Sequence, residues 1–451
     1  MKQIDFANGK IGSNVLASAL PLLVAQVLNL LYSIVDRLYI GRIPGDGTAA
    51  LGGVGLCFPM IILVTAFTNL FGLGGAPLCS IRRGRGETDE AREVMNTAGT
   101  CLLITAVLLT VAGELFAVPL LRAMGASGSS LRFALPYMRI YLTGTLFSMI
   151  ATGLNPYINS QGFANVGMVT VVIGAVTNIV LDPVLIFGLG MGVEGAAVAT
   201  VLSQALSALF VLRFLTGPRA ELRLQFHRPS EWGSHLRTAA DIASLGTSAF
   251  IMQFTNSLVS MVCNSMLTGY EGGIYVSVMT IISSVRQLLD VPVLAIAEGT
   301  SPVISFNYGA GRKPLIRKAV LLMTAINIAY TFVVWIAIEL RADLFIRIFS
   351  SDASLLTQAV PALRLYFRAF LFQAFQMCGQ TAFKALNKKK QAIFFSLFRK
   401  VIIVVPLTIL LPTVFGMGPA GVFMAEPISN FVGGCACYIT MVCIVWRMTR
   451  E

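Results

Sequence analysis

Long apolar runs separated by short polar segments make up most of the chain. A helix rises ~1.5 Å per residue, so about 20 apolar residues cross the ~30 Å hydrocarbon core of a bilayer. Runs that meet this length occupy residues 11–40, 48–76, 94–121, 132–158, 165–188, 194–216, 241–268, 274–303, 315–341, 357–383, 392–414 and 419–446. The pattern predicts an all-α integral membrane protein with twelve transmembrane helices.

The two halves of the chain share residues at a constant offset of 225 positions. The offset relates identical prolines, glycines, tyrosines and charged residues in corresponding runs: Pro77 with Pro302, Gly84 with Gly309, Gly86 with Gly311, Glu114 with Glu339, Pro136 with Pro361, Arg139 with Arg364 and Tyr141 with Tyr366. The motifs "GMGVEG" and "GMGPAG" match at an offset of 226. Each half has an even number of spans, so we expect two parallel, pseudo-symmetric six-helix lobes, an arrangement found in transporters.

The repeat also predicts the domain boundaries. We expect an N-terminal lobe at residues 1–216, a cytoplasmic inter-lobe linker at residues 217–240 and a C-terminal lobe at residues 241–451. The linker is shorter than the ~50 residues of the smallest folded domains. The chain therefore has no room for a soluble domain between its lobes.

The composition excludes a soluble protein. The chain is 56% hydrophobic and 12% charged, with a mean hydropathy of +0.78, whereas soluble domains are about 25% charged. The net charge of +12 arises from short basic clusters between apolar runs, so it indicates membrane topology rather than nucleic-acid binding. With the N-terminus inside, the inside segments carry 23 of the 33 Lys and Arg residues, Arg399 and Lys400 included. We expect both termini to be cytoplasmic.

Several catalytic and cofactor chemistries have no motif in this sequence. The eight cysteines lack zinc-binding spacing, and His227 and His235 stand in the polar linker rather than in a span. The glycine-rich segments "GLGGAP" and "GAGRK" lack the GxxxxGK[ST] form that binds phosphates. We therefore expect no enzymatic activity, no resident metal or organic cofactor and no ATP-driven transport by this chain alone.

Two acidic residues inside predicted spans are the first candidates for a functional site, because an ionisable side chain within a bilayer costs several kcal/mol. Asp36, Asp182 and Thr200 each stand five or six residues from the outer end of a run, roughly 7–10 Å below the outer surface. Asn178 lies four residues before Asp182, on the same helical face. These oxygens could share a proton or bind a hard cation such as sodium, and the alternative is that each acid pairs with an arginine or caps a broken helix.

The repeat favours a specialised site in the first half. Asn264 takes the place of Asp36 in the second half, and an apolar stretch near Val405 and Pro406 takes the place of Asp182. Acids needed only by the scaffold should occur in both halves. Arg37, next to Asp36, points about 100° away around the helix and is a poor ion-pair partner.

The second half has ionisable residues of its own. Arg286, Asp290, Glu298 and Glu426 lie within predicted spans and form a possible C-lobe site. An alternative for Arg286 and Asp290 is mutual neutralisation across one helical turn. Pro21 should bend the first span because it removes a backbone donor, and this bend is either a moving part or static.

Four segments resemble one membrane transport family across nearly the whole chain: "VDRLYIGR", "NPYINSQGFANVG", "NIVLDPVLIFGLGMGVEGAAVAT" and "SPVISFNYGAGR". They are similar to the multidrug and toxic compound extrusion (MATE) family, in its bacterial branch with an acidic pair in the N-lobe. The resemblance implies a cation-coupling site at Asp36, Asn178, Asp182, Thr200, Tyr137 and Asn155, with Pro21 as a conformational hinge. Glu298 stands where relatives commonly have Gln, which keeps a second titratable site in the C-lobe open.

The resemblance and the acidic pair together predict the function. We expect a secondary active transporter that exports drugs or toxic, lipophilic or cationic organic compounds by antiport with H⁺ or Na⁺. Its partners would be a small-molecule drug or toxic metabolite and membrane lipid, with no nucleic acid, and it would act as a monomer in the bacterial cytoplasmic membrane. The alternatives are a lipid-linked oligosaccharide flippase of the same superfamily and a channel. The residues suit both H⁺ and Na⁺.

Overall fold

The computed structural model describes residues 3–45, 47–126, 128–225, 235–270, 274–349 and 353–450, and within these ranges every regular element is a helix. Nine continuous helical stretches of the described chain are long and apolar enough to cross a membrane. The predicted spans at 132–158, 241–268 and 357–383 fall on further helices. A lipid environment explains why these elements are all helices, because a helix satisfies its backbone hydrogen bonds within one segment.

Two compact units make up the chain. Unit 1 comprises Met1–Asp5 and Pro21–Phe250, and unit 2 comprises Phe6–Leu20 and Ile251–Glu451. The boundaries fall inside two helices, α1 (Ile11–Gly41) and α10 (Leu236–Thr268). The first of these boundaries coincides with Pro21. Of the predicted linker, residues 226–234 lie outside the described residues.

Unit 1 contains the remainder of the first half of the sequence. Its other helices are α2 (Gly47–Gly55), α3 (Phe58–Gly84), α4 (Thr88–Ala123), α5 (Gly128–Thr143), α6 (Thr145–Gly153), α7 (Asn155–Ser160), α8 (Ala164–Pro183), the π-helical segment η1 (Val184–Gly188) and α9 (Gly192–Thr216). The pairs α3–α4 and α8–α9 pack along their lengths, and α6 also packs on α9. Their core is apolar, with Leu102, Met149 and Tyr157 fully buried.

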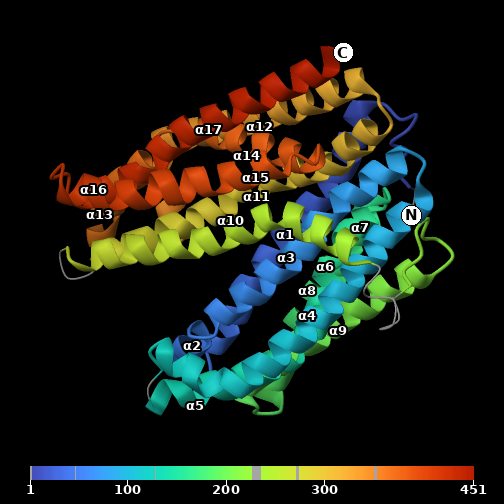
Figure 1. The fold of residues 1–451 in the computed structure, drawn as a ribbon. Helices are drawn as coiled ribbons and strands as arrows, with labels where there is room; N and C mark the ends of the chain where they lie inside the picture. The colour runs from blue at the N-terminus through green and yellow to red at the C-terminus, as the bar shows by residue number, and fades with distance from the viewer. Residues whose placement is uncertain are drawn as a thin grey trace. The chain divides into compact units, whose positions relative to one another are not determined.

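Unit 2 contains most of the second half of the sequence. It contains α11 (Ile274–Gly309), α12 (Lys313–Arg347), α13 (Ala353–Phe367), α14 (Leu371–Ala385), α15 (Lys389–Leu397), the π-helical segment η4 (Phe398–Val404), α16 (Val405–Thr413) and α17 (Pro419–Arg450). Helices α14 and α17 run side by side, as do α11 and α12 (Figure 1). The predicted span at 392–414 is therefore not one regular helix but α15, η4 and α16 in succession.

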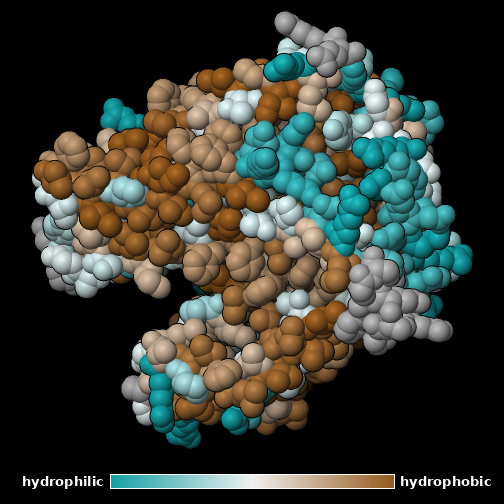
Figure 2. All heavy atoms as spheres, in the orientation of Figure 1, coloured by the Kyte–Doolittle hydropathy of each residue, from teal (hydrophilic) through white to brown (hydrophobic). Residues whose placement is uncertain are grey.

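Apolar side chains on the outside of the helices are what a lipid environment requires. Leu108 and Leu115 of α4 and Leu340 of α12 are among the large hydrophobic residues that remain exposed. Figure 2 shows apolar residues covering much of the face in view. The helices thus bury one apolar side against each other and present another outward, as expected of helices in a bilayer.

Glycines allow two close helix contacts that are related by the sequence repeat. A Cβ atom at Gly74 of α3 would lie 2.5 Å from the carbonyl oxygen of Ile242 in α10, within unit 1. A Cβ atom at Gly299 of α11 would lie 2.6 Å from Cα of Ala19 in α1, within unit 2. The two glycines are 225 positions apart (299 − 74). Only glycine fits, because backbone atoms stand where a side chain would begin.

An oxygen cluster in unit 1 and an ionic cluster in unit 2

The oxygen cluster of unit 1 consists of Asp36, Asn178, Asp182 and Thr200. Helix α1 carries Asp36 toward α8, which carries Asp182, and the two carboxyl groups lie within hydrogen-bonding reach of each other. Asp182 is fully buried. The two acids are 146 positions apart in sequence (182 − 36), so the tertiary structure brings them together. The structure thus places the two carboxyl groups near each other, and their role in cation coupling stays a prediction.

Asn178 and Thr200 complete the cluster. The Asn178 amide donates hydrogen bonds to Oδ1 of Asp182 at 3.3 Å and to Oγ1 of Thr200 at 3.5 Å. Thr200 in turn donates to the carbonyl of Ala196, one turn earlier in α9. Asn178 and Asp182 share a face of α8 because they are four residues apart. The structure thus joins Asn178, Asp182 and Thr200 through hydrogen bonds, and their depth in the bilayer stays a prediction.

Buried oxygens without donors give the cluster its chemistry. Oδ1 of Asp36, Oδ2 of Asp182 and Oδ1 of Asn178 are buried and receive no hydrogen bond. A buried acceptor without a donor costs roughly 1–3 kcal/mol, and more when it is charged. A proton held between the carboxyl groups, or a small cation bound by the oxygens, would remove this cost.

Two tyrosines border the oxygen cluster. Tyr137 of α5 is buried, interacts electrostatically with Asp36 and stacks on Tyr141 with ring centroids 6.5 Å apart. Tyr32 of α1 interacts electrostatically with both Asp36 and Asp182. Sequence reasoning missed Tyr32, although its spacing of four residues from Asp36 places it on the same helical face.

The guanidinium of Arg37, the residue next to Asp36, lies against an aromatic ring. It lies over the ring of Phe58, 4.9 Å from the centroid. A cation over an aromatic face is stabilised by the ring quadrupole. Arg37 still exerts an electrostatic effect on Asp36. The alternative in which Asp36 is merely an ion-pair partner of its neighbour is therefore disfavoured.

Asn155 and Pro21 lie away from the oxygen cluster. The Asn155 amide donates to the carbonyl of Gly167 at 3.0 Å, and its oxygen accepts from Asn159 at 3.4 Å. Gly167 precedes Asn178 by 11 residues, or roughly 16 Å along α8. The structure thus does not bring Asn155 to these oxygens. Pro21 precedes Asp36 by 15 residues, or roughly 22 Å along α1, and marks the unit boundary.

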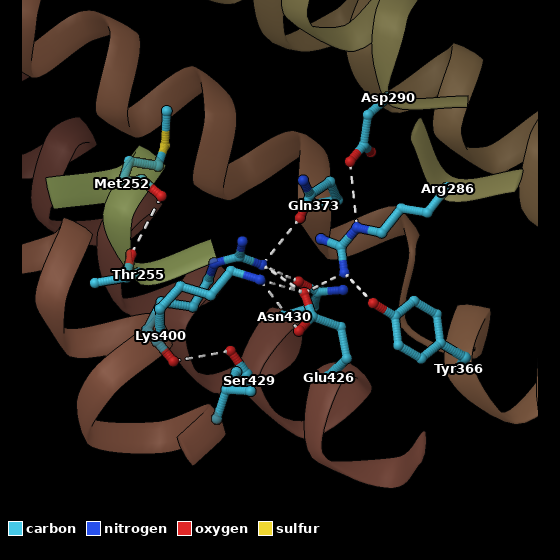
Figure 3. Close-up of polar contacts among 12 residues, drawn as sticks. Met252, Thr255, Arg286, Asp290, Tyr366, Gln373, Lys400, Glu426, Ser429 and Asn430 are labelled. Carbon is cyan, nitrogen blue, oxygen red and sulfur yellow. Dashed lines mark hydrogen bonds and ion pairs between the residues drawn. The ribbon is translucent and has the colours of Figure 1, made fainter. Parts of the chain in front are cut away.

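The ionic cluster of unit 2 joins three of the four candidate C-lobe residues. Arg286 of α11 forms ion pairs with Asp290 at 3.2 Å and with Glu426 of α17. It also donates to the hydroxyl of Tyr366 in α13 at 2.7 Å. Mutual neutralisation of Arg286 and Asp290 is therefore an incomplete explanation, since Glu426 shares the guanidinium. Figure 3 shows Arg286 reaching toward Glu426 from one side and Lys400 from the other.

Arg399 and Lys400 correct the sequence-based topology. The charge count placed both at the cytoplasmic side, but the structure buries them beside Glu426. Nη1 of Arg399 lies 3.1 Å from the Glu426 carboxylate, and Nζ of Lys400 lies 3.2 Å from it. Both belong to η4, whose extra residue per turn changes the direction of successive side chains. Hydropathy alone cannot reveal this, because the partner acid is on another helix.

Glu298 belongs to a separate environment. It is half-buried in α11 and interacts electrostatically with Lys384 of α14. Glu298 follows Asp290 by eight residues, or roughly 12 Å along the helix. The four candidate C-lobe residues thus divide into the ionic cluster and this pair.

These features define the class of the protein. The described helices are those of a multi-pass membrane protein, and ionisable side chains lie inside them rather than only at their ends. Such residues mark ion and substrate pathways. The chain is a polytopic α-helical transporter and not an enzyme.

Comparison with known proteins gives the family. The family model described as MatE matches residues 21–184 and 248–410, one match in each half of the chain. The chain therefore belongs to this family and is an efflux transporter of the MATE type, as its sequence motifs predicted.

Individual proteins of known name are similar to this chain over most of their length. The chain is 23% identical to the multidrug export protein MepA of Staphylococcus haemolyticus, over 88% of this chain and 86% of that protein. It is 25% identical to an FAD transporter of Shewanella oneidensis, over 95% and 94%. Its fold matches a crystal structure of MATE in the bent conformation with a TM-score of 0.92 and 24% identity, covering 100% and 99% of the two chains. The predicted fold class is confirmed.

Proposed function

We propose that this chain exports drugs or toxic, lipophilic or cationic organic compounds by antiport with H⁺ or Na⁺. The observation that carries the coupling mechanism is the proximity of the Asp36 and Asp182 carboxyl groups, with one buried oxygen of each lacking a donor. The similarity to proteins named as multidrug exporters supports drugs as the exported substrates. The proposal needs no organic cofactor.

The oxygen cluster accounts for the use of either cation. A proton on one carboxyl group would donate to the other and remove the repulsion between two charges. A sodium ion would instead use carboxylate, amide and hydroxyl oxygens, the ligands that hard cations prefer. In both cases the cation links α1 to α8, because Asp36 and Asp182 are on different helices.

Helix α1 is the element through which cation binding would reach the drug. Residues from Pro21 onward belong to unit 1, whereas Phe6–Leu20 belongs to unit 2. Pro21 lacks the backbone donor that would otherwise close the helical turn at this boundary. We propose Pro21 as a hinge: a cation entering from outside holds the Asp36 end of α1 against α8, bends the helix and lowers the affinity for bound drug.

The basic segments support the orientation. Lys and Arg residues of multi-pass proteins collect in cytoplasmic loops. Moving Arg399 and Lys400 into the membrane still leaves 21 of the 33 basic residues on the inside (23 − 2). We propose a bacterial cytoplasmic membrane location with both termini in the cytoplasm, and transport by a single chain.

The test uses purified full-length protein in liposomes that contain ethidium. Efflux is measured under an imposed proton gradient and, in separate vesicles, under a sodium gradient. We expect one gradient to drive efflux by the wild type and neither to drive it in Asp36→Asn or Asp182→Asn. Each variant removes a charge while keeping the size of the side chain.

Glu114→Gln is the matched control. Glu114 is a half-buried carboxylate of α4 that pairs with Arg139 at 3.6 Å, and Arg139 is not a member of the oxygen cluster. It should keep gradient-driven efflux, which shows that loss of any carboxylate is not enough. Full efflux by well-folded Asp36→Asn and Asp182→Asn would refute the proposed coupling.

A further inference from the structure

The ionic cluster of unit 2 places three basic side chains in the interior of one helical unit. Arg286, Arg399 and Lys400 have side-chain exposures of 13%, 8% and 7%. They come from α11 and η4 and converge on α17 (Figure 3). Such residues inside a membrane protein usually serve an ion or substrate, because the cost of burying each charge is several kcal/mol.

The cluster contains one more basic side chain than acidic side chains. The three basic residues face two carboxylates, Glu426 and Asp290, so the balance is +1 (3 − 2). Arginine does not lose its proton in proteins. Lys400 lies 3.2 and 3.3 Å from the two Glu426 oxygens, which is the geometry of an ammonium group with a carboxylate. The excess positive charge of the cluster therefore depends on a protonated Lys400.

The neutral groups around the cluster do not supply the missing negative charge. Arg399 donates to the amide oxygens of Gln373, at 3.1 Å, and of Asn430. These dipoles satisfy the guanidinium donors without changing the net charge. Asp290 pairs with Arg286, and its Oδ1 is buried without a hydrogen bond. Glu426 is the carboxylate that contacts all three basic side chains, so an additional anion would bring the net charge of the cluster closer to zero.

The sequence repeat shows how the cluster relates to the oxygen cluster of unit 1. At the offset of 226, Glu426 of α17 corresponds to Thr200 of α9 (426 − 200). Gly162 and Asn387, both with positive φ, are 225 positions apart and stand just before helices α8 and α15. Counted from there, Arg399 and Lys400 correspond to Gly174 and Ala175 of α8. Helix α8 of unit 1 thus carries the acid Asp182, whereas the corresponding segment of unit 2 carries Arg399 and Lys400.

We propose that the ionic cluster is a binding subsite for an anionic group, a carboxylate or phosphate, on the exported compound. Arg399 and Lys400 would exchange part of their interaction with Glu426 for the oxygens of the ligand. Two bases one residue apart in η4 suit this role because both face the same carboxylate. The inference rests on the proposed function and extends the substrate class from cationic compounds to compounds with an acidic group.

The test compares two dyes that differ in one group. Rhodamine B carries a free carboxylate, and its ethyl ester does not. Binding to the full-length protein in lipid nanodiscs is followed by fluorescence anisotropy, with empty nanodiscs to subtract partition into lipid. We expect the wild type to bind the acid about tenfold more tightly than the ester, the size of one charge-assisted hydrogen bond. Equal affinities would overturn the proposal without any variant.

Three variants locate the preference. Lys400→Met should reduce the ratio of acid to ester affinity to near one, whereas Lys400→Arg should keep it. Lys390→Met removes an exposed lysine of α15 and should also keep the ratio. An unchanged ratio in a well-folded Lys400→Met protein, or loss of thermal stability as its sole effect, would mean that the cluster is structural and would overturn the proposal.

Two further results distinguish the proposed subsite from a free-anion site and from the proposed antiport. If inorganic phosphate or chloride binds the cluster while the acid has no advantage over the ester, the ligand is a free anion and the proposal fails. Efflux of both dyes from liposomes under the active cation gradient tests the proposed function separately. Gradient-driven export of the ester, without preferred binding of the acid, would leave the antiport intact and refute the anionic subsite.

Discussion

Glu426 is the residue on which the stability of unit 2 should depend most strongly. Glu426→Gln keeps the shape of the side chain but leaves Arg286, Arg399 and Lys400 opposite one remaining carboxylate, Asp290. Removing one member of a buried ionic network costs about 3–5 kcal/mol. A domain of 150–250 residues loses about 2–4 °C of melting temperature per kcal/mol, so we expect a decrease of roughly 6–20 °C.

For the measurement, the full-length protein is fused to a fluorescent protein and heated in detergent. Size-exclusion chromatography with fluorescence detection then gives the fraction that remains folded at each temperature. Asp343→Asn is the matched control, because Asp343 pairs with Arg341 at 3.3 Å where both side chains are exposed, and such pairs contribute about 0–1 kcal/mol. The double variant Glu426→Gln with Lys400→Met should recover part of the loss, since it removes one base along with the acid. A melting temperature of Glu426→Gln within about 2 °C of the wild type would refute the reasoning.

Two further predictions concern single side chains. Gly299→Ala should lower the melting temperature, because its Cβ would lie 2.6 Å from Cα of Ala19 and overpacking costs about 1–3 kcal/mol, whereas Gly55→Ala, with open space around its Cβ, should not; equal stability of the two variants contradicts the close contact. Asn178→Ala should shift the cation concentration that half-saturates efflux, while Asn155→Ala, whose bonds go to Gly167 and Asn159, should change stability without that shift. Identical cation dependence in both variants would argue against the oxygen cluster as the coupling site.

The sequence predicts the helices well because the bilayer imposes one rule on all of them. Every span must be apolar and long enough, so hydropathy locates them without knowledge of tertiary packing. Hydropathy locates the span at 392–414 correctly, since residues Lys389–Thr413 form one apolar helical stretch long enough to cross a membrane, but it does not give the helix type. The run at 392–414 reads as one span, yet it consists of α15, η4 and α16. Nothing in its apolar pattern distinguishes a π-helical turn from an α-helical one.

The oxygen cluster could be predicted because three of its members stand at the same distance from the outer ends of their apolar runs. Counting residues from the ends of three runs placed Asp36, Asp182 and Thr200 at one level, and depth is a one-dimensional property of the sequence. Tyr32 was within reach of the same reasoning through its spacing of four residues from Asp36. Asn155 was included in the predicted site through family resemblance alone. It contacts Gly167, which lies 11 residues before Asn178 along α8.

The ionic cluster shows the limit of reading charges one segment at a time. Arg399 and Lys400 follow three lysines at 388–390, so a charge count assigns all five to the cytoplasm. Their burial depends on Glu426, which lies 26 positions beyond Lys400 on α17 (426 − 400). A basic residue in an apolar run should therefore be tested against acids in the neighbouring spans before it is assigned to a loop. For this chain the test leads from a topology signal to a candidate subsite for an anionic group.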